Sequence, residues 1–218
     1  MSKRREILSL VCSAVLMLPL AACRSGVRES DNAWFAAAQQ GDAASMDRAA
    51  ASGADINAQE RRSHNTPLQM AAVAGNEAAV RGLLAKGANI NATDKANRTA
   101  LTLACYNGRD NAALALVNAG ADLEVRDRKQ QTALHFAAVK NLSEVVRAMI
   151  ARNVNLNAQS DEGSTPLYFA AREGNLETVR VLRAAGADPS IRDRKGRSPA
   201  DVAASSNRDE IRRALGAM

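Results

Sequence analysis

The residues of this chain that are able to catalyse a reaction or hold a metal are few and far apart. The 218 residues include two histidines and three cysteines. His64 falls in a polar stretch typical of a loop, and His135 lies inside the tetrapeptide Thr-Ala-Leu-His. Neither histidine has a partner at a catalytic spacing, and the cysteines lack the paired spacing of a zinc site. We therefore expect no metal, no cofactor and no enzymatic activity.

One cysteine is placed for a different chemistry, the attachment of a lipid. Cys23 closes the sequence Leu-Ala-Ala-Cys, after a basic start and an apolar run from Ile7 to Leu20. That run is too short to span a membrane and has the length of a signal-peptide core. The arrangement resembles the signal of bacterial lipoproteins, in which small residues precede a cysteine that carries diacylglycerol. An ordinary cleaved signal peptide with a chance cysteine is the alternative.

The resemblance implies export, cleavage and a lipid anchor. Residues 1–22 form the signal that is removed, Cys23 is the lipidated residue, and residues 23–30 are a short tether. Arg24 follows the cysteine where an aspartate would favour the inner membrane, so the outer membrane is favoured. We expect the chain to lie in the bacterial envelope and to face the periplasm.

A strict internal repeat must position every residue after the tether. Openings that begin with Thr or Ser recur every 33 residues, at Thr66, Thr99, Thr132, Thr165 and Ser198. Most openings are followed by paired alanines, then by a glycine or asparagine, and later by a Gly-Ala pair. These features resemble ankyrin repeats, whose units open with Thr-Pro-Leu-His. The resemblance covers essentially all of residues 31–218.

The resemblance implies an all-α fold, an ankyrin solenoid of about six helix-turn-helix units with β-hairpin tips. The expected units are residues 31–65, 66–98, 99–131, 132–164, 165–197 and 198–218, of which the first and last are caps. Thr66 is a good helix N-cap, Pro67 suits the first helical position, and Gly75 can end the helix in the left-handed conformation. Because stacked units bury small residues, an aromatic content of 3% is sufficient.

Several residues depart from the repeat pattern or recur at one position. Asn141 and Asn153 replace glycines, which asparagine tolerates because it enters the left-handed region. Arg183 replaces the equivalent of Leu84, which predicts a face near solvent or, less favoured, near a ligand. His135 is expected to be structural, and Cys105 a small core residue. Core positions on the first helices are predicted at Met70, Leu103, Phe136 and Phe169.

Binding must then come from a surface, which in ankyrin proteins is the concave face and the hairpin tips. On the first helices the expected partner-binding residues are Tyr106, Asn107, Lys140 and Arg172. Tyr106 is the best anchor because tyrosine is enriched in binding hot spots. At the tips, the sequence Arg-Asp-Arg-Lys occurs twice and supplies Arg126, Arg128, Lys129, Arg192, Arg194 and Lys195.

The net charge of +6 gathers at the tips, although Asp161 and Glu162 make one tip acidic. Simple solvation of the hairpins and an electrostatic face for an acidic protein partner are both consistent with this pattern. A third possibility is contact with anionic lipid head groups, because the tether is short. Export argues against nucleic acid as the ligand. We expect a monomer.

Two cellular roles follow from the resemblance to exported ankyrin proteins. One is an immunity lipoprotein that neutralises a secreted antibacterial toxin such as a phospholipase. The other is an accessory role in periplasmic peroxide defence beside a catalase. Neither role is encoded by a residue pattern, because repeat arrays bind through surface shape.

Overall fold

The computed structural model describes residues 32–205 and 209–216, and in these ranges the chain forms twelve helices and no β-strand. The all-helical architecture agrees with the predicted solenoid, whereas the strands of the predicted hairpin tips are not confirmed. Six helices open the successive pairs: α1 (Asn32–Gln40), α3 (Pro67–Ala74), α5 (Ala100–Tyr106), α7 (Ala133–Val139), α9 (Pro166–Glu173) and α11 (Pro199–Ser205). Six close them: α2 (Ala43–Ala51), α4 (Glu77–Ala85), α6 (Asp110–Asn118), α8 (Ser143–Ala151), α10 (Leu176–Ala184) and α12 (Asp209–Ala214).

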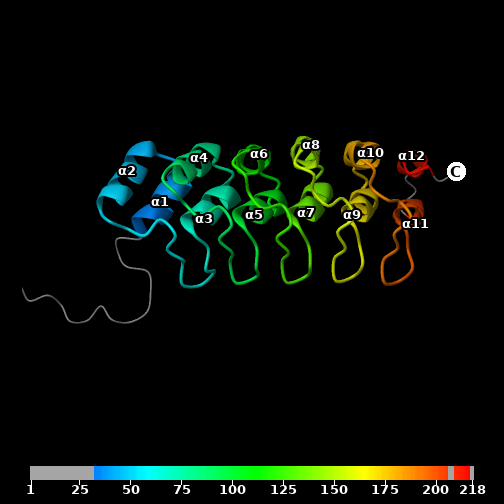
Figure 1. Cartoon of the computed structure of the whole chain (residues 1–218), viewed down its shortest axis with the longest axis horizontal. Coiled ribbons are helices and arrows are strands. Elements are labelled where there is room, and N and C mark those ends of the chain that lie inside the picture. Colours follow the sequence, from blue (N-terminus) through cyan, green and yellow to red (C-terminus); the bar gives the residue numbers. More distant parts are fainter. Residues whose placement is uncertain (1–31, 206–208, 217–218) are drawn as a thin grey trace, which may run out of the picture.

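The helices form two layers along one axis (Figure 1). Each opening helix packs on its closing partner and on the opening helices of the neighbouring pairs. The closing helices contact one another in the same order and make the second layer. Long loops between the pairs project to one side, beneath the opening helices (Figure 1). The array therefore presents a loop edge and, opposite to it, a layer of closing helices.

The ends of α3 show how the repeated sequence sets the helix boundaries. The Thr66 hydroxyl accepts from the Gln69 backbone N–H at 3.3 Å, and the Gln69 side-chain oxygen accepts from the Thr66 N–H at 2.7 Å. This capping box satisfies donors that would otherwise be unpaired at the helix start. Pro67 occupies the first helical turn and Gly75, with φ of 77°, ends the helix. The predicted start and stop signals are confirmed here.

Asparagine replaces glycine at two left-handed positions, as the sequence predicts. Asn141 has φ of 57° and Asn153 has φ of 58°. Asparagine tolerates this conformation better than most residues, so the fourth repeat keeps the geometry of its neighbours. Arg183, the other departure, is partly buried, and its Nη1 donates to the Ala187 carbonyl at 2.7 Å.

The core runs continuously through the array and is made mainly of small side chains. Ala71, Ala72 and Leu83 are completely buried, which lets neighbouring helices approach closely. Of the four recurring apolar residues, Leu103 and Phe169 are buried as predicted. Phe136 is partly buried and packs against this core. Met70 is only partly buried, which corrects the prediction at that position.

The predicted signal peptide, the tether and Cys23 lie outside the described residues. Among the helices that the structure describes, none is long and apolar enough to cross a membrane.

Candidate functional site

Five loops, here called tips 1 to 5, form the edge that projects from the helices. They comprise residues 60–65, 94–98, 126–131, 160–164 and 192–197. A backbone N–H at the start of each tip donates across the loop, for example from Asp94 to Arg98 at 3.0 Å and from Ser160 to Ser164 at 3.0 Å. Each tip also contains one residue in the left-handed conformation: His64, Asn97, Gln130, Gly163 and Gly196. The tips are thus closed turns of defined shape.

Hydrogen bonds between backbones fix neighbouring tips to one another. The N–H of Asp161 in tip 4 donates to the Lys129 carbonyl of tip 3 at 2.9 Å, and the N–H of Arg194 in tip 5 donates to the Glu162 carbonyl at 2.8 Å. Gly163 favours this close approach, because a Cβ there would lie only 3.2 Å from the Arg194 nitrogen and the φ of 76° is strained for other residues. The tips therefore make a continuous face, here called the tip face, rather than separate loops.

Most of the tip aspartates hold the turns together. The Asp94 carboxylate is buried, accepts from the N–H groups of Ala96 and Arg98, and pairs with the Arg98 guanidinium at 2.7 Å. Asp193 has the same arrangement with Arg197. Both carboxylates are buried and already hydrogen-bonded within the protein, so they are not available to a partner.

The basic residues of tips 3 and 5 divide into two groups. Arg126 donates to the Gln159 carbonyl at 3.0 Å, and Arg192 donates to the Gly196 carbonyl at 2.6 Å and to the Asp201 carboxylate at 3.0 Å. Four others are exposed, and within the described ranges their side chains form no ion pair and no hydrogen bond: Arg128, Lys129, Arg194 and Lys195. This second group is the part of the predicted set that is free to bind.

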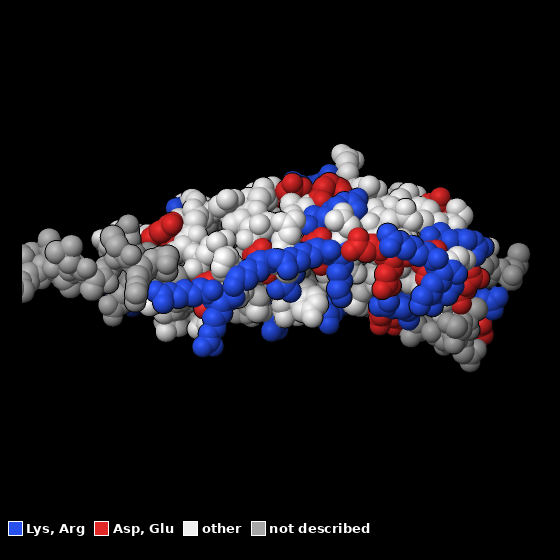
Figure 2. Space-filling view, turned by 90° about the horizontal axis from the view of Figure 1, so that it is seen from below, with Lys and Arg blue, Asp and Glu red and all other residues white. Residues whose placement is uncertain are grey.

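Viewed from the tips, lysine and arginine side chains form a band along the length of the array, interrupted by acidic side chains toward the C-terminal half (Figure 2). The tip face is therefore basic but not uniformly so.

Tyr106 lies at the end of α5, beside the tip face, and is the one large hydrophobic residue among those described that is exposed, at 48%. Its ring meets the edge of Phe136 with centroids 5.5 Å apart, and the Arg98 guanidinium lies 6.0 Å from its centroid. These contacts hold the ring in place while leaving half of it uncovered. The predicted exposure of Tyr106 is confirmed, and its role as an anchor stays a prediction.

The remaining first-helix residues differ in how available they are. Lys140 is exposed at the end of α7. Asn107 is half-buried, and its amide donates to the Leu103 carbonyl at 2.8 Å. Arg172 lies over the Phe169 ring at 4.7 Å and pairs with Glu173 at 2.7 Å. Lys140 is therefore accessible to a partner, whereas the Asn107 amide is already bonded to its own helix.

A hollow of about 420 Å³ lies between tips 3 and 4 on one side and α9 on the other. Lys129, Gln131, Ser160, Asp161, Glu162, Phe169 and Arg172 line it. Phe169 supplies an apolar wall, and the charged side chains of both signs surround it. The hollow is the concave part of the tip face.

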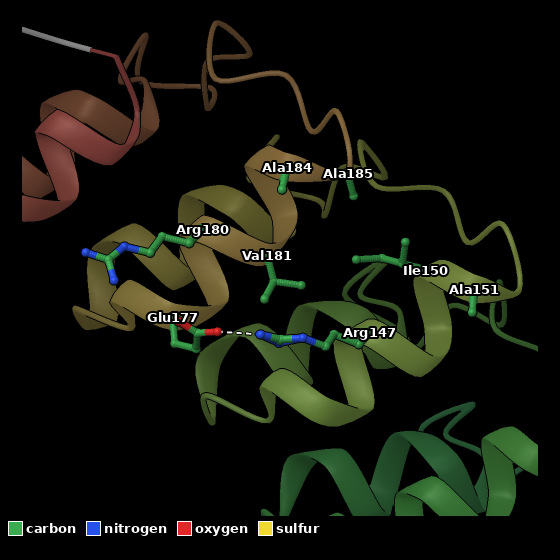
Figure 3. Close-up of a pocket in the computed structure, with 8 residues that line it drawn as sticks. All are labelled: Arg147, Ile150, Ala151, Glu177, Arg180, Val181, Ala184 and Ala185. Atoms are coloured by element: carbon green, nitrogen blue, oxygen red, sulfur yellow. Dashed lines mark hydrogen bonds and ion pairs between the residues drawn. The ribbon is translucent and has the colours of Figure 1, made fainter.

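The closing-helix layer carries a different kind of hollow, of about 610 Å³, between α8 and α10 (Figure 3). Its walls include Ile150 and Val181, and the ion pair between Arg147 and Glu177 spans its rim (Figure 3). Of the two arginines that line this hollow, Arg147 is paired and Arg180 is exposed. Sequence reasoning gave no sign of this hollow, since its apolar residues follow the ordinary helical pattern.

His135 and Cys105 have structural surroundings. The Thr132 N–H donates to His135 Nδ1 at 3.0 Å, which leaves the proton on Nε2, 3.2 Å from the Ser164 carbonyl of tip 4. Burial lowers the pKa of His135 to about 4. Cys105 is fully buried, and burial raises the pKa of its thiol far above the ordinary value. Within the described residues no group of His, Cys, Asp and Glu gathers as a metal site.

The sequence did not reveal one link between a helix and the next tip. The hydroxyl of Tyr168, at the position of His135 in the next repeat, donates to the Asp193 carboxylate at 2.9 Å. Burial acts to raise the pKa of Asp193, but bonds from Arg197, Tyr168 and Lys195 outweigh it and hold that pKa at about 2. The signal for this link was a tyrosine at the position that is histidine in the preceding repeat.

The stacked helix pairs with a projecting loop edge define a solenoid repeat protein, a class that acts by binding other proteins. A family model described as ankyrin repeats (3 copies) matches residues 33–127 and 134–217. The chain belongs to the ankyrin repeat family, whose members are generally non-catalytic scaffolds for protein–protein interaction. No curated protein matches the chain.

Proposed function

We propose that this chain is a lipid-anchored, periplasmic ankyrin scaffold that binds an acidic protein partner through the tip face and the adjoining helix ends. The observation that supports the partner's charge is the set of exposed, unpaired cations on tips 3 and 5. A cluster of unpaired charge of one sign accelerates the encounter with an oppositely charged protein. Tyr106 adds an apolar anchor at the border of the same face. No catalytic step is part of this proposal.

The test compares two charge reversals of equal size. Arg128→Glu with Arg194→Glu changes the tip face, and Arg180→Glu with Arg213→Glu changes exposed positions on the closing helices. Partner proteins are crosslinked and captured from the native envelope with the wild type and both variants. We expect the tip variant to lose the partner and the control variant to keep it. Capture of the partner by the wild type and both variants would show that the interface lies outside the tip face.

The anchor and the cellular role have their own measurements. Cys23→Ala should abolish incorporation of labelled palmitate and release the protein from the membrane fraction. Killing of a deletion strain by toxin-bearing siblings, with normal peroxide tolerance, would support the immunity role. Peroxide sensitivity without toxin sensitivity would support the accessory role in peroxide defence. Salt-sensitive binding to anionic vesicles alone would replace the protein partner by a lipid surface.

A further inference from the structure

The tip face carries an ordered change of sign. Tip 3 presents Arg128 and Lys129, and tip 5 presents Arg194 and Lys195, all exposed and unpaired. Between them, tip 4 presents Asp161 and Glu162. Both acidic residues are exposed, and their side chains form no ion pair with any other described residue. The three adjacent tips thus read basic, acidic, basic.

The spacing of these charges is fixed by the backbone. Tips 3 and 4 are joined through the Lys129 carbonyl, and tips 4 and 5 through the Glu162 carbonyl. Neighbouring tips extend from helices that pack side by side, at the usual separation of about 8–10 Å. An extended chain covers that distance in about three residues. A ligand that follows the tips would meet a new sign of charge about every third residue.

Asp161 and Glu162 are the position on tip 4 where a basic side chain of a ligand would be attracted. The hollow beside them is lined by charges of both signs, because Lys129 and Arg172 also border it, and the Arg172 guanidinium covers the Phe169 ring at 4.7 Å. The attraction therefore comes from the two exposed carboxylates, not from the hollow. The cations of tips 3 and 5 stand on either side of this position, where they meet acidic residues of the same ligand.

We propose that tips 3 to 5 bind an extended segment of the protein partner in which charges follow the order acidic, basic, acidic, about three residues apart. This inference rests on the proposed function and adds the charge order to it. A purely acidic segment, or a uniformly anionic lipid surface, would place negative charge against the unpaired carboxylates of tip 4. Like charges in contact oppose binding, so the observations favour a segment of mixed charge.

Two synthetic peptides of identical composition test the charge order. One is Gly-Glu-Glu-Ser-Lys-Ser-Glu-Glu-Gly, and the other permutes it to Gly-Lys-Ser-Glu-Glu-Glu-Glu-Ser-Gly. Binding to the full-length chain in detergent is measured by fluorescence anisotropy at low salt. We expect the first peptide to bind about fivefold more tightly, the value of one exposed charge pair.

Variants then show whether tip 4 causes the preference. Asp161→Lys with Glu162→Lys should reverse it, because the tip face becomes basic throughout. Glu144→Lys with Glu210→Lys, on the closing helices, makes the same change of net charge and should leave the preference intact. Equal binding of both peptides, or a preference that survives the tip 4 variant, overturns the charge order.

The outcomes separate this inference from the proposed function. Equal binding of both peptides that is lost with Arg128→Glu and Arg194→Glu would keep the basic docking face and overturn only the charge order. Failure of both peptides to bind at low salt would overturn the tip face as a receptor for acidic segments altogether.

Discussion

Tips 3 and 5 contain the same four residues, Arg-Asp-Arg-Lys, but their aspartates are held differently. The Asp193 carboxylate accepts from two backbone N–H groups, the Arg197 guanidinium and the Tyr168 hydroxyl. The Asp127 carboxylate accepts from the N–H groups of Lys129 and Gln131. The four identical residues therefore do not determine how many hydrogen bonds hold the aspartate of the tip.

Two residues outside the shared sequence account for the difference. Four residues after the aspartate, tip 5 has Arg197 and tip 3 has Gln131. In the opening helix of the same repeat, the position that faces the tip holds Tyr168 for tip 5 and Thr102 for tip 3. The Thr102 hydroxyl lies 3.1 Å from that of Thr99 in its own repeat. A side chain of the opening helix thus holds the aspartate of tip 5 but not that of tip 3, whereas the Asn97 side chain of the preceding repeat donates to the Arg126 carbonyl of tip 3 at 2.6 Å.

The largest effect is expected from removing the two aspartates. Asp193→Ala removes the acceptor of two backbone N–H groups, of the buried Tyr168 hydroxyl and of the half-exposed Arg197 guanidinium, and the lost bonds together should cost about 3–5 kcal/mol of unfolding free energy. Asp127→Ala removes bonds to two N–H groups and should cost about 1–2 kcal/mol. Urea unfolding measures the total, and amide hydrogen exchange locates the loss in each tip. Equal costs would show that the bonds of Arg197 and Tyr168 add no stability.

Acid should weaken the helix-to-tip link made by His135 before it affects Asp193. In the folded chain the pKa of His135 is about 4, against 6.5 for a free histidine. The unfolded chain therefore binds more protons between these values, and stability falls as pH decreases from about 6.5 to 4. The full loss is about 3 kcal/mol. Asp193, with a pKa of about 2 against 3.8, contributes its loss only below about pH 4.

His135→Gln isolates this effect, because Gln69 occupies the same position in the second repeat. The Gln69 amide donates to the Ala92 and Arg98 carbonyls at 3.0 and 2.8 Å, so glutamine can make the link without titrating. Urea unfolding between pH 7 and 4 should show a flatter slope for this variant. His64→Gln, at an exposed turn, is the control. An unchanged slope in His135→Gln would assign the acid sensitivity to other groups.

The sequence predicted the repeat period and the helix boundaries better than the side-chain contacts between neighbouring elements. The 33-residue period, the threonine caps and the left-handed positions follow from local chemistry, and the helix starting at Pro67 and the conformation of Asn141 confirm them. The half-burial of Phe136 and the pairing of Arg192 with Asp201 depend on neighbouring elements. A repeat pattern assigns equivalent positions, but it does not show which partner the neighbouring repeat supplies.

A smaller effect is expected from giving tip 3 the arginine that tip 5 has. Gln131→Arg places a guanidinium four residues after Asp127, the spacing at which Arg98 pairs with Asp94 in tip 2. The gain should be about 1 kcal/mol, because the aspartate is buried and the arginine remains partly exposed. A double-mutant cycle with Asp127→Asn measures the pair itself. A gain that persists with asparagine at 127 would rule out the ion pair as its cause.

The smallest effect concerns the backbone of the same two tips. Gln130 has φ of 57°, while Gly196 occupies the equivalent position of tip 5 with φ of 75°. A residue with a side chain is strained in this region, so Gln130→Gly should raise the unfolding free energy by about 0.5 kcal/mol, net of the entropy lost by glycine. Gly163→Ala makes the opposite change in tip 4 and should destabilise it, since its φ is 76° and the new methyl group would crowd the Arg194 nitrogen. If both variants shifted the urea midpoint in the same direction, strain at the left-handed position would not explain the difference between tips.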